Sequence, residues 1–243
     1  MARSFGGVNA LAGATFDVPA GSITGLIGPN GAGKSTMIGV IAGAIRPQSG
    51  RVAFFGTDIT GWAPHRVAQQ GLIRTYQLSS EFGKMTVLEN LLVAGPGQRG
   101  ESVRGALLGR RYWWPEEADL ISQARDVLAR FGMSDKEDEY AANLSGGQKR
   151  LVEIMRGLMA QPKLLLLDEP LAGVNPTLAR QILNYLSALR DAGVTIVMAE
   201  HDLGAVGRVC EPVVVMARGS VLASGSLTTL RARKEVQDAY FIG

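Results

Sequence analysis

The residue types and spacing best suited to chemistry lie between positions 28 and 36. This stretch fits the pattern G-x-x-x-x-G-K-[ST], in which a glycine-rich loop wraps phosphate groups. Its glycines let successive backbone N–H groups point at phosphate oxygens, aided by the positive end of the following helix. We expect nine residues to contact a nucleotide here: Gly28, Pro29, Asn30, Gly31, Ala32, Gly33, Lys34, Ser35 and Thr36.

Two side chains in this stretch have specific expected roles. Lys34 would reach the β- and γ-phosphates of a nucleoside triphosphate, and the Ser35 hydroxyl would bind Mg²⁺. Residues 23–27 suit a buried strand, and residues 35–44 suit a helix packed on a sheet. The alternative is a glycine-rich turn that binds nothing, and the order strand, loop, helix argues against it.

A second candidate group follows the apolar run 164–167, which ends in Asp168 and Glu169. A buried strand that ends in two carboxylates places them at the carboxyl edge of a sheet, where α/β folds bind ligands. We expect Asp168 to hold Mg²⁺ through water and Glu169 to orient or deprotonate an attacking water. Acidic residues at this position also cap helices, but their combination with Lys34 favours phosphoryl transfer.

A third group, Ser145, Gly146, Gly147 and Gln148, precedes a helix with apolar residues at helical spacing. Ser145 and Gln148 have capping-box spacing, so a structural role would explain both. The two glycines each cost on the order of 1 kcal/mol relative to alanine in a first helical turn, which indicates that something approaches this backbone closely. A helix start with bare N–H groups suits a phosphate. Because the loop at 28–36 already binds one, we expect this group to face the nucleotide of a second subunit.

These candidate residues need a scaffold, and the surrounding sequence predicts an α/β fold. Short apolar runs predict four buried strands, at 23–27, 164–167, 194–199 and 213–217. Helical patterns lie between most of them, which predicts a mostly parallel sheet covered on both faces. Residues 14–18 and 51–55 are expected to be antiparallel edge strands.

The middle of the chain has helical patterns and no convincing strand. Thr86 and Glu89 have capping-box spacing ahead of an apolar segment. Four residues recur on one helical face that stops at a glycine: Ile121, Ala124, Leu128 and Phe131, before Gly132. We expect one domain, with a helical subdomain at 78–160 inserted into a core formed by 1–77 and 161–243.

Composition limits the class of protein. A chain of 243 residues is long for one domain and short for two. Its apolar stretches are far too short to span a bilayer and no secretion signal is evident, which predicts a cytoplasmic location. The single cysteine, Cys210, excludes an internal disulfide framework. A net charge of +3 without a long basic run argues against nucleic acid as a partner.

These motifs together resemble those of the ATP-binding subunits of ABC transporters, over nearly the whole chain. Leu144 to Gln148 match the family's LSGGQ signature, in the family's order between the phosphate loop and Asp168. The resemblance implies a P-loop NTPase core with a mostly parallel sheet, a small antiparallel β region and an inserted helical subdomain. It implies ATP hydrolysis as the activity, with ATP and Mg²⁺ bound.

The resemblance also implies roles for three residues outside these motifs. Gln77 matches the Q-loop glutamine, which senses Mg²⁺ in catalysis and joins the core to the helical lobe. His201 follows the expected strand at 194–199 and matches the switch histidine that contacts the γ-phosphate. Phe5 resembles the aromatic residue that stacks on adenine, with ordinary packing as the alternative.

Two departures from the family pattern change what we expect. The D-loop usually carries aspartate, whereas Asn175 stands here, so cross-talk between subunits is expected to differ in detail. The chain begins only four residues before Phe5, so most of the family's first edge strand is expected to be missing.

Within the family, the resemblance is closest to branched-chain amino acid importer subunits. It lies in six segments: 5–8, 71–77, 85–92, 173–176, 200–202 and 239–243. Urea and amide importers and lipopolysaccharide-export ATPases share several of them. The implied partners are a second ATPase subunit, identical or different, two membrane-spanning permease subunits and an extracytoplasmic solute-binding protein. The resemblance also implies that the chain lies on the inner face of the cell membrane.

Two alternatives come from other classes. Soluble ABC ATPases that act on DNA or ribosomes typically carry two cassettes or long coiled coils, and this chain has one cassette without sustained heptads. A regulatory nucleotide-binding module without turnover is the second alternative, and Glu169 and His201 argue against it.

Overall fold

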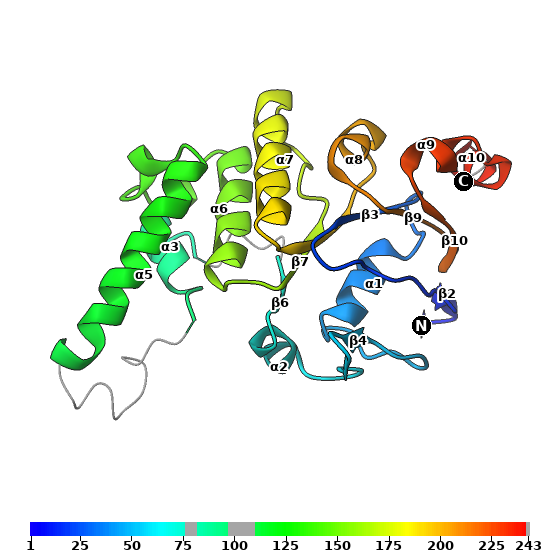
Figure 1. Cartoon of the computed structure of the whole chain (residues 1–243), viewed down its shortest axis with the longest axis horizontal. Helices are drawn as coiled ribbons and strands as arrows, with labels where there is room; N and C mark the ends of the chain where they lie inside the picture. The colour runs from blue at the N-terminus through cyan, green and yellow to red at the C-terminus, as the bar shows by residue number, and fades with distance from the viewer. Residues whose placement is uncertain (76–81, 97–109, 242–243) are drawn as a thin grey trace. The chain divides into compact units, whose positions relative to one another are not determined.

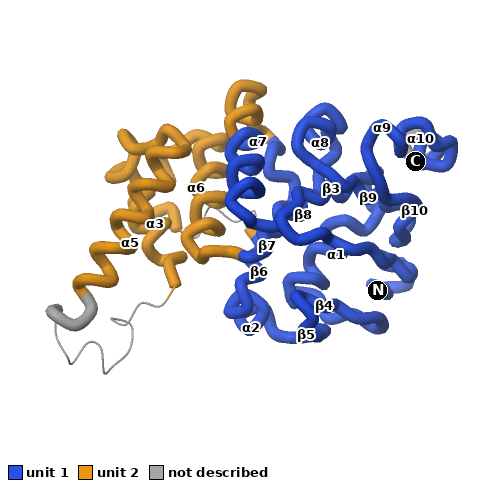
Figure 2. Tube along the Cα trace, in the orientation of Figure 1, with its two compact units in different colours: residues 1–74, 163–172, 182–243 blue, residues 75–162, 173–181 orange. Residues whose placement is uncertain are grey.

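The computed structural model describes residues 1–75, 82–96 and 110–241, and it contains two compact units (Figure 2). Unit 1 consists of residues 1–74, 163–172 and 182–243. Unit 2 consists of residues 75–162 and 173–181. The expected helical subdomain at 78–160 stays a prediction. No helix in the described ranges is long and apolar enough to cross a membrane.

Unit 1 is built on a six-stranded sheet with the order β10-β9-β3-β8-β7-β6 (Figure 1). Five strands run parallel: β3 (Ile23–Ile27), β6 (Leu72–Arg74), β7 (Leu164–Asp168), β8 (Thr195–Ala199) and β9 (Val213–Ala217). The last strand, β10 (Ser220–Gly225), pairs antiparallel with β9. The predicted α/β class with a mostly parallel sheet is confirmed, and the four predicted strands are β3, β7, β8 and β9.

Helices cover both faces of this sheet. Successive side chains of a strand point to opposite faces, so each face has its own helical partner. On β3, Leu26 belongs to the same buried cluster as Met37 of α1. The neighbouring Gly25 faces the other way, and a Cβ there would lie 3.1 Å from Val206 of α8. Figure 1 shows α1 and α8 on opposite sides of β3. The helices of unit 1 are α1 (Lys34–Ile41), α2 (Pro64–Gln69), α8 (Leu203–Val209), α9 (Leu227–Arg231) and α10 (Lys234–Phe241).

Two hairpins form the small antiparallel β region. The first pairs β1 (Ala2–Phe5) with β2 (Val8–Ala12), and the second pairs β4 (Ala53–Phe54) with β5 (Thr57–Asp58). The second hairpin turns at Phe55 and Gly56, both at positive φ, as in a type I′ hairpin turn. The strand expected at 51–55 is therefore shorter than predicted.

The prediction of a strand at 14–18 is wrong. Side chains there alternate between exposed and more buried positions, as in a strand, but the segment joins none of the described sheets. It borders a largely apolar cavity of about 600 Å³, lined also by Met37, Leu164 and Val197. Alternation reports which way side chains point, whereas a strand also needs a neighbour with which to form hydrogen bonds.

Unit 2 contains helices α3 (Val87–Leu92), α5 (Arg110–Arg130) and α6 (Gly146–Met159), in which α3 contacts both α5 and α6. Two 3₁₀ turns, η2 (Ser134–Lys136) and η3 (Ala141–Asn143), join α5 to α6. The capping box at Thr86 and Glu89 is confirmed. Ala124 and Leu128 of α5 are fully buried, as the helical pattern predicts. Helix α7 (Pro176–Asp191) includes residues of both units.

Candidate functional site

The loop between β3 and α1 is shaped by close packing against other parts of unit 1. Gly28 has φ of 153°, and a Cβ there would lie 2.1 Å from the carbonyl oxygen of Met216. Gly33 has φ of 103° and precedes α1, and its Cβ would lie 2.4 Å from the carbonyl oxygen of Ala10. Side chains are excluded at both positions, so the fold fixes the course of this loop. The first amide groups of α1 have no partner within the helix and are available to an anion.

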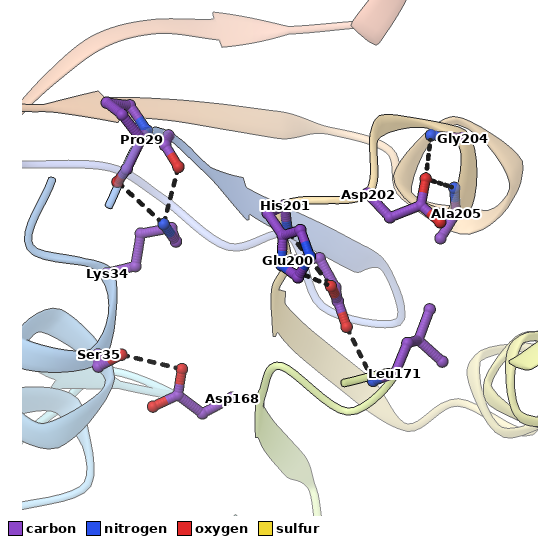
Figure 3. A network of polar contacts seen from close by, with 11 residues as sticks. Pro29, Lys34, Ser35, Asp168, Leu171, Glu200, His201, Asp202, Gly204 and Ala205 are labelled. Carbon is purple, nitrogen blue, oxygen red and sulfur yellow. Dashed lines mark hydrogen bonds and ion pairs between the residues drawn. The ribbon is translucent and has the colours of Figure 1, made fainter. Parts of the chain in front are cut away.

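Lys34 lies folded over this loop. Its Nζ donates hydrogen bonds to the carbonyl oxygens of Gly28, at 2.7 Å, and Pro29, at 3.1 Å (Figure 3). The side chain is buried, and burial lowers the pKa of Lys34, while the charges of Glu169, Asp168 and Glu200 act in the opposite direction. The loop therefore holds a cation where the sequence predicts phosphate groups.

Asp168 lies at the carboxyl end of β7, within reach of α1. The Ser35 hydroxyl donates to Asp168 Oδ1 at 3.1 Å, and Arg74 Nη2 lies 3.3 Å from Asp168 Oδ2. Two oxygen atoms of the kind that Mg²⁺ prefers thus lie side by side. Arg74 was missed in the sequence, because its role depends on β6 lying beside β7.

Glu169 leaves the strand in an unusual backbone conformation. Its φ is 50°, a region that side chains disfavour, and non-glycine residues there cluster at functional sites. Its N–H donates to the carbonyl oxygen of Ala199 at 2.9 Å, and its carbonyl oxygen accepts from Ala172 at 3.2 Å. A turn thus begins at Glu169, whose side chain is half-buried.

His201 follows β8, and its side chain is 64% exposed. The residue before it, Glu200, is only 1% exposed and was missed in the sequence. Glu200 Oε1 accepts from the Leu171 N–H at 2.9 Å, and Oε2 accepts from the His201 N–H at 3.2 Å (Figure 3). Burial raises the pKa of Glu200, and these two hydrogen bonds partly oppose that rise. A glutamate beside a histidine gives no sequence signal for such a bridge.

Unit 2 carries the predicted group at Ser145. Ser145 Oγ accepts from the Gln148 N–H at 3.3 Å, and Gln148 Oε1 accepts from the Ser145 N–H at 2.9 Å, so the predicted capping box is present. A Cβ at Gly147 would meet only the flexible end of Leu178, at 2.8 Å, and one at Gly146 would meet nothing within 4 Å. Packing within the described chain therefore does not require glycine at position 146.

Two predicted site residues remain, Gln77 and Phe5. Gln77 lies outside the described residues. Phe5 lies at the end of β1 and is 43% exposed, with the guanidinium of Arg3 4.7 Å from its ring centre. Its ring is therefore available for stacking, and it already takes part in a cation–π contact.

Unit 1 thus joins a strand, a glycine-rich loop and a helix to an aspartate at the end of a second parallel strand, β7, separated from β3 by β8. Lys34, Ser35, Asp168, Glu169 and His201 all come from the carboxyl edge of this sheet or from the helix that follows it. Such an edge is where α/β sheets bind ligands, and the motif is a phosphate-binding loop. The fold and the site define the class of P-loop nucleoside triphosphatases.

Comparisons with known proteins narrow this class. Residues 11–172 match the ABC transporter family. A relative from Archaeoglobus fulgidus, "Probable branched-chain amino acid transport ATP-binding protein LivG", is 40% identical over 240 residues, which are 99% of this chain and 92% of that protein. "High-affinity branched-chain amino acid transport ATP-binding protein LivG" of Escherichia coli K12 is 32% identical over 237 residues, 97% of this chain and 93% of that protein.

Solved structures agree with these relatives. A nucleotide-free ATP-binding cassette from an ABC transporter is 38% identical, with a TM-score of 0.85, and the match covers 99% of this chain and 96% of that one. The ADP conformation of an ATP-binding cassette of an ABC transporter is 36% identical, with a TM-score of 0.84 and coverage of 100% and 96%. The chain belongs to the ABC transporter family, and it is an ATPase of that family.

Proposed function

We propose that this chain supplies the energy for uptake of a small solute, branched-chain or other hydrophobic amino acids, by hydrolysing ATP. The observation that carries this proposal is similarity over nearly the full length to relatives named as branched-chain amino acid transport ATP-binding proteins. The presence of Lys34, Glu169 and His201 at one sheet edge supports turnover over nucleotide binding alone.

In the proposed reaction, the loop from Gly28 to Thr36 holds the phosphate chain with its N–H groups. Lys34 exchanges its carbonyl partners for the β- and γ-phosphate oxygens, which places a cation beside the charge that develops during transfer. Glu169 orients the attacking water and accepts its proton. His201, exposed at the end of β8, contacts the γ-phosphate.

The residues present fit Mg²⁺. Ser35 Oγ and Asp168 Oδ1 are hard oxygen atoms 3.1 Å apart, so the hydroxyl would bind the ion directly and the carboxylate would hold it through water; Mg²⁺ commonly takes few protein ligands and completes its shell with water and phosphate. Within the described residues, no group of three or more acidic, histidine or cysteine side chains would form a full cage. When bound, Mg²⁺ neutralises phosphate charge. Gln77 is proposed as a further residue of this site.

The signature group is proposed to complete the site of a partner subunit. Gly146 has open space where a side chain would be, and Ser145 retains a hydroxyl hydrogen to donate while its oxygen accepts from Gln148. A phosphate from a second ATPase subunit fits this helix start. Glycine at 146, which packing within the described chain does not require, supports this assignment over capping alone.

The remaining partners and the location follow from the proposed function. Two membrane-spanning permease subunits would take the mechanical output of the ATPase pair, and a solute-binding protein outside the membrane would deliver the solute. The chain would then lie on the cytoplasmic side of the membrane. Phe5 is proposed to stack on adenine.

Purification with the native membrane subunits, followed by reconstitution into vesicles, tests the proposal. With solute-binding protein and labelled leucine, isoleucine or valine outside and ATP inside, we expect uptake that stops in Glu169→Gln. The matched control is Glu235→Gln, an exposed glutamate of α10, which should keep full uptake. A complex that hydrolyses ATP but moves urea or amides instead would overturn the substrate assignment, and purification from native membranes without any membrane-spanning partner would overturn the transport role.

A further inference from the structure

Glu200 is a buried carboxylate for which the proposed reaction has no use. It lies directly after β8 and is 1% exposed, and its own N–H donates to the carbonyl oxygen of Leu26 in β3 at 3.2 Å. An unpaired carboxylate at such a depth costs several kcal/mol by desolvation. A residue with that cost is expected to make contacts that a neutral side chain cannot make.

The contacts of Glu200 join two separate chain segments. One carboxylate oxygen accepts from the N–H of Leu171, 29 positions earlier, and the other accepts from the N–H of His201. Leu171 belongs to the turn that begins at Glu169, which closes through the hydrogen bond from Ala172 to Glu169. Figure 3 shows the Glu200 side chain reaching from the His201 segment to Leu171.

The two segments carry the groups that must act on the same phosphate. Glu169 follows β7 and His201 follows β8, so their relative placement depends on loops that leave two different strands. The strand ladder ends here with the bond from Glu169 to Ala199, and beyond it the Glu200 carboxylate links the two segments through the bond from Leu171. On its other side, the His201 segment is held by Asp202, whose Oδ1 accepts from the N–H groups of Gly204 and Ala205 at 2.7 and 3.2 Å.

We propose that Glu200 is a positioning residue for ATP hydrolysis, whose buried carboxylate fixes the Glu169 turn and the His201 main chain relative to each other. This inference rests on the proposed roles of Glu169 and His201. Glu200 itself touches neither water nor phosphate in this reaction. Its contribution is the alignment of one segment with the other, to which hydrolysis rates are sensitive at the scale of 1 Å.

The chemistry of the bridge requires a carboxylate. Both oxygens of an ionised carboxylate accept hydrogen bonds, and bonds to an ionised acceptor are stronger than neutral ones. Glutamine has the same shape but only one acceptor, so its NH₂ group would face the N–H of either Leu171 or His201. Aspartate keeps the charge and both acceptors but is one methylene shorter, so it cannot span both segments without backbone movement.

The test compares Glu200→Gln with the wild-type chain in the assembled transporter, with kcat expressed per site that binds a labelled ATP analogue. We expect kcat to fall about 10- to 100-fold with the KM for ATP within about threefold, because the nucleotide contacts remain while alignment is lost. The kcat of Glu200→Asp should lie between the values of the wild type and of Glu200→Gln. Glu235→Gln, matched in chemistry and exposed, should leave both constants unchanged.

A kcat within threefold of wild type for Glu200→Gln would overturn the inference, as would a raised KM with unchanged kcat. If Glu200→Gln does not fold, Glu200→Asp is judged by the same two criteria. Glu169→Gln separates this inference from the function on which it rests. If Glu169→Gln keeps normal turnover, the role of Glu169 fails; if it abolishes turnover while Glu200→Gln does not reduce it, only the positioning role fails.

Discussion

Ser35 and Asp168 are 133 positions apart in the chain, and the Ser35 hydroxyl donates a 3.1 Å hydrogen bond to the Asp168 carboxylate. The bond joins the first turn of α1 to the end of β7, across the position of β8 in the sheet. The two side chains that would hold Mg²⁺, Ser35 directly and Asp168 through water, thus already contact each other.

Asp168→Asn should raise the Mg²⁺ requirement of ATP hydrolysis. The amide keeps one oxygen but loses the charge that attracts the cation, so we expect the Mg²⁺ concentration for half-maximal activity to rise about tenfold or more. ATPase assays at fixed ATP and varied free Mg²⁺ measure this. Asp17→Asn, at an exposed position of the same unit, should follow the wild-type curve. An unchanged Mg²⁺ dependence in Asp168→Asn would remove Asp168 from the metal site.

Lys34→Ala should weaken ATP binding and nearly abolish hydrolysis. It removes a charge-assisted contact worth roughly 1.5–3 kcal/mol, which corresponds to at least about a tenfold loss of affinity. Titration calorimetry with ATP provides the measurement. Lys234→Ala is the matched control because Lys234 is exposed in α10. If Lys34→Ala bound ATP as tightly as the wild type and turned it over normally, the nucleotide site would lie elsewhere.

Glu169→Gln should separate binding from chemistry. Glutamine keeps the shape and hydrogen-bonding capacity of the side chain but accepts no proton from water, so we expect ATP to bind while turnover collapses. The variant should accumulate as a dimer with MgATP, visible by size-exclusion chromatography. A Glu169→Gln chain that stays monomeric and hydrolyses ATP at the wild-type rate would refute the assigned role.

Mixed subunits should show that Ser145 acts on the partner's nucleotide and Lys34 on its own. When inactive Lys34→Ala and Ser145→Arg subunits combine, both changes fall on one composite site and the other site is intact. We expect ATPase activity to return, up to about half of the wild-type rate per mixed dimer if the sites act independently. The assay needs the assembled transporter or high protein concentration. Mixed dimers without any recovered activity would favour a site within one chain or obligatory coupling of both sites.

Stability should depend on pH through Glu200. Burial raises its pKa, with the nearby charge of Glu169 acting in the same direction and that of His201 in the opposite one. Between the ordinary carboxyl pKa and the raised value, the folded chain binds more protons than the unfolded chain, so the free energy of unfolding falls as pH rises through this window. Glu200→Gln should show a smaller fall in the free energy of unfolding, measured with urea as pH rises above the ordinary carboxyl pKa. Glu153, whose pKa burial also raises, keeps part of the slope. Parallel curves for the two proteins would contradict the prediction.

The parts of the fold that could be predicted are those with strong local signals. The strands β3, β7, β8 and β9 are apolar runs, and the helix starts at Thr86 and Ser145 carry capping boxes. The three-residue strand β6 is too short to show a period, and the segment at 14–18 shows a strand's alternation without a partner strand.

The same difference between residues with and without a local sequence signal holds for the candidate site. The loop residues could be recognised because they are contiguous in sequence, and the same holds for the two carboxylates at the end of β7. Arg74 and Glu200 could not, because each is defined by a partner far along the chain: Arg74 contacts Asp168, 94 positions away, and Glu200 contacts Leu171, 29 positions away. The role of such a residue can be recognised only when the fold shows which distant residue it contacts.

The two hydrogen bonds from Lys34 to Gly28 and Pro29 bear on the heat of nucleotide binding. A phosphate chain that recruits the Lys34 ammonium must displace two carbonyl oxygens from it, so the new ionic contacts replace existing bonds. The measured enthalpy is then the difference between two sets of bonds and is smaller than the number of new contacts implies. Discrimination in this loop rests on charge, because only a ligand with oxygens more negative than a peptide carbonyl competes for the ammonium.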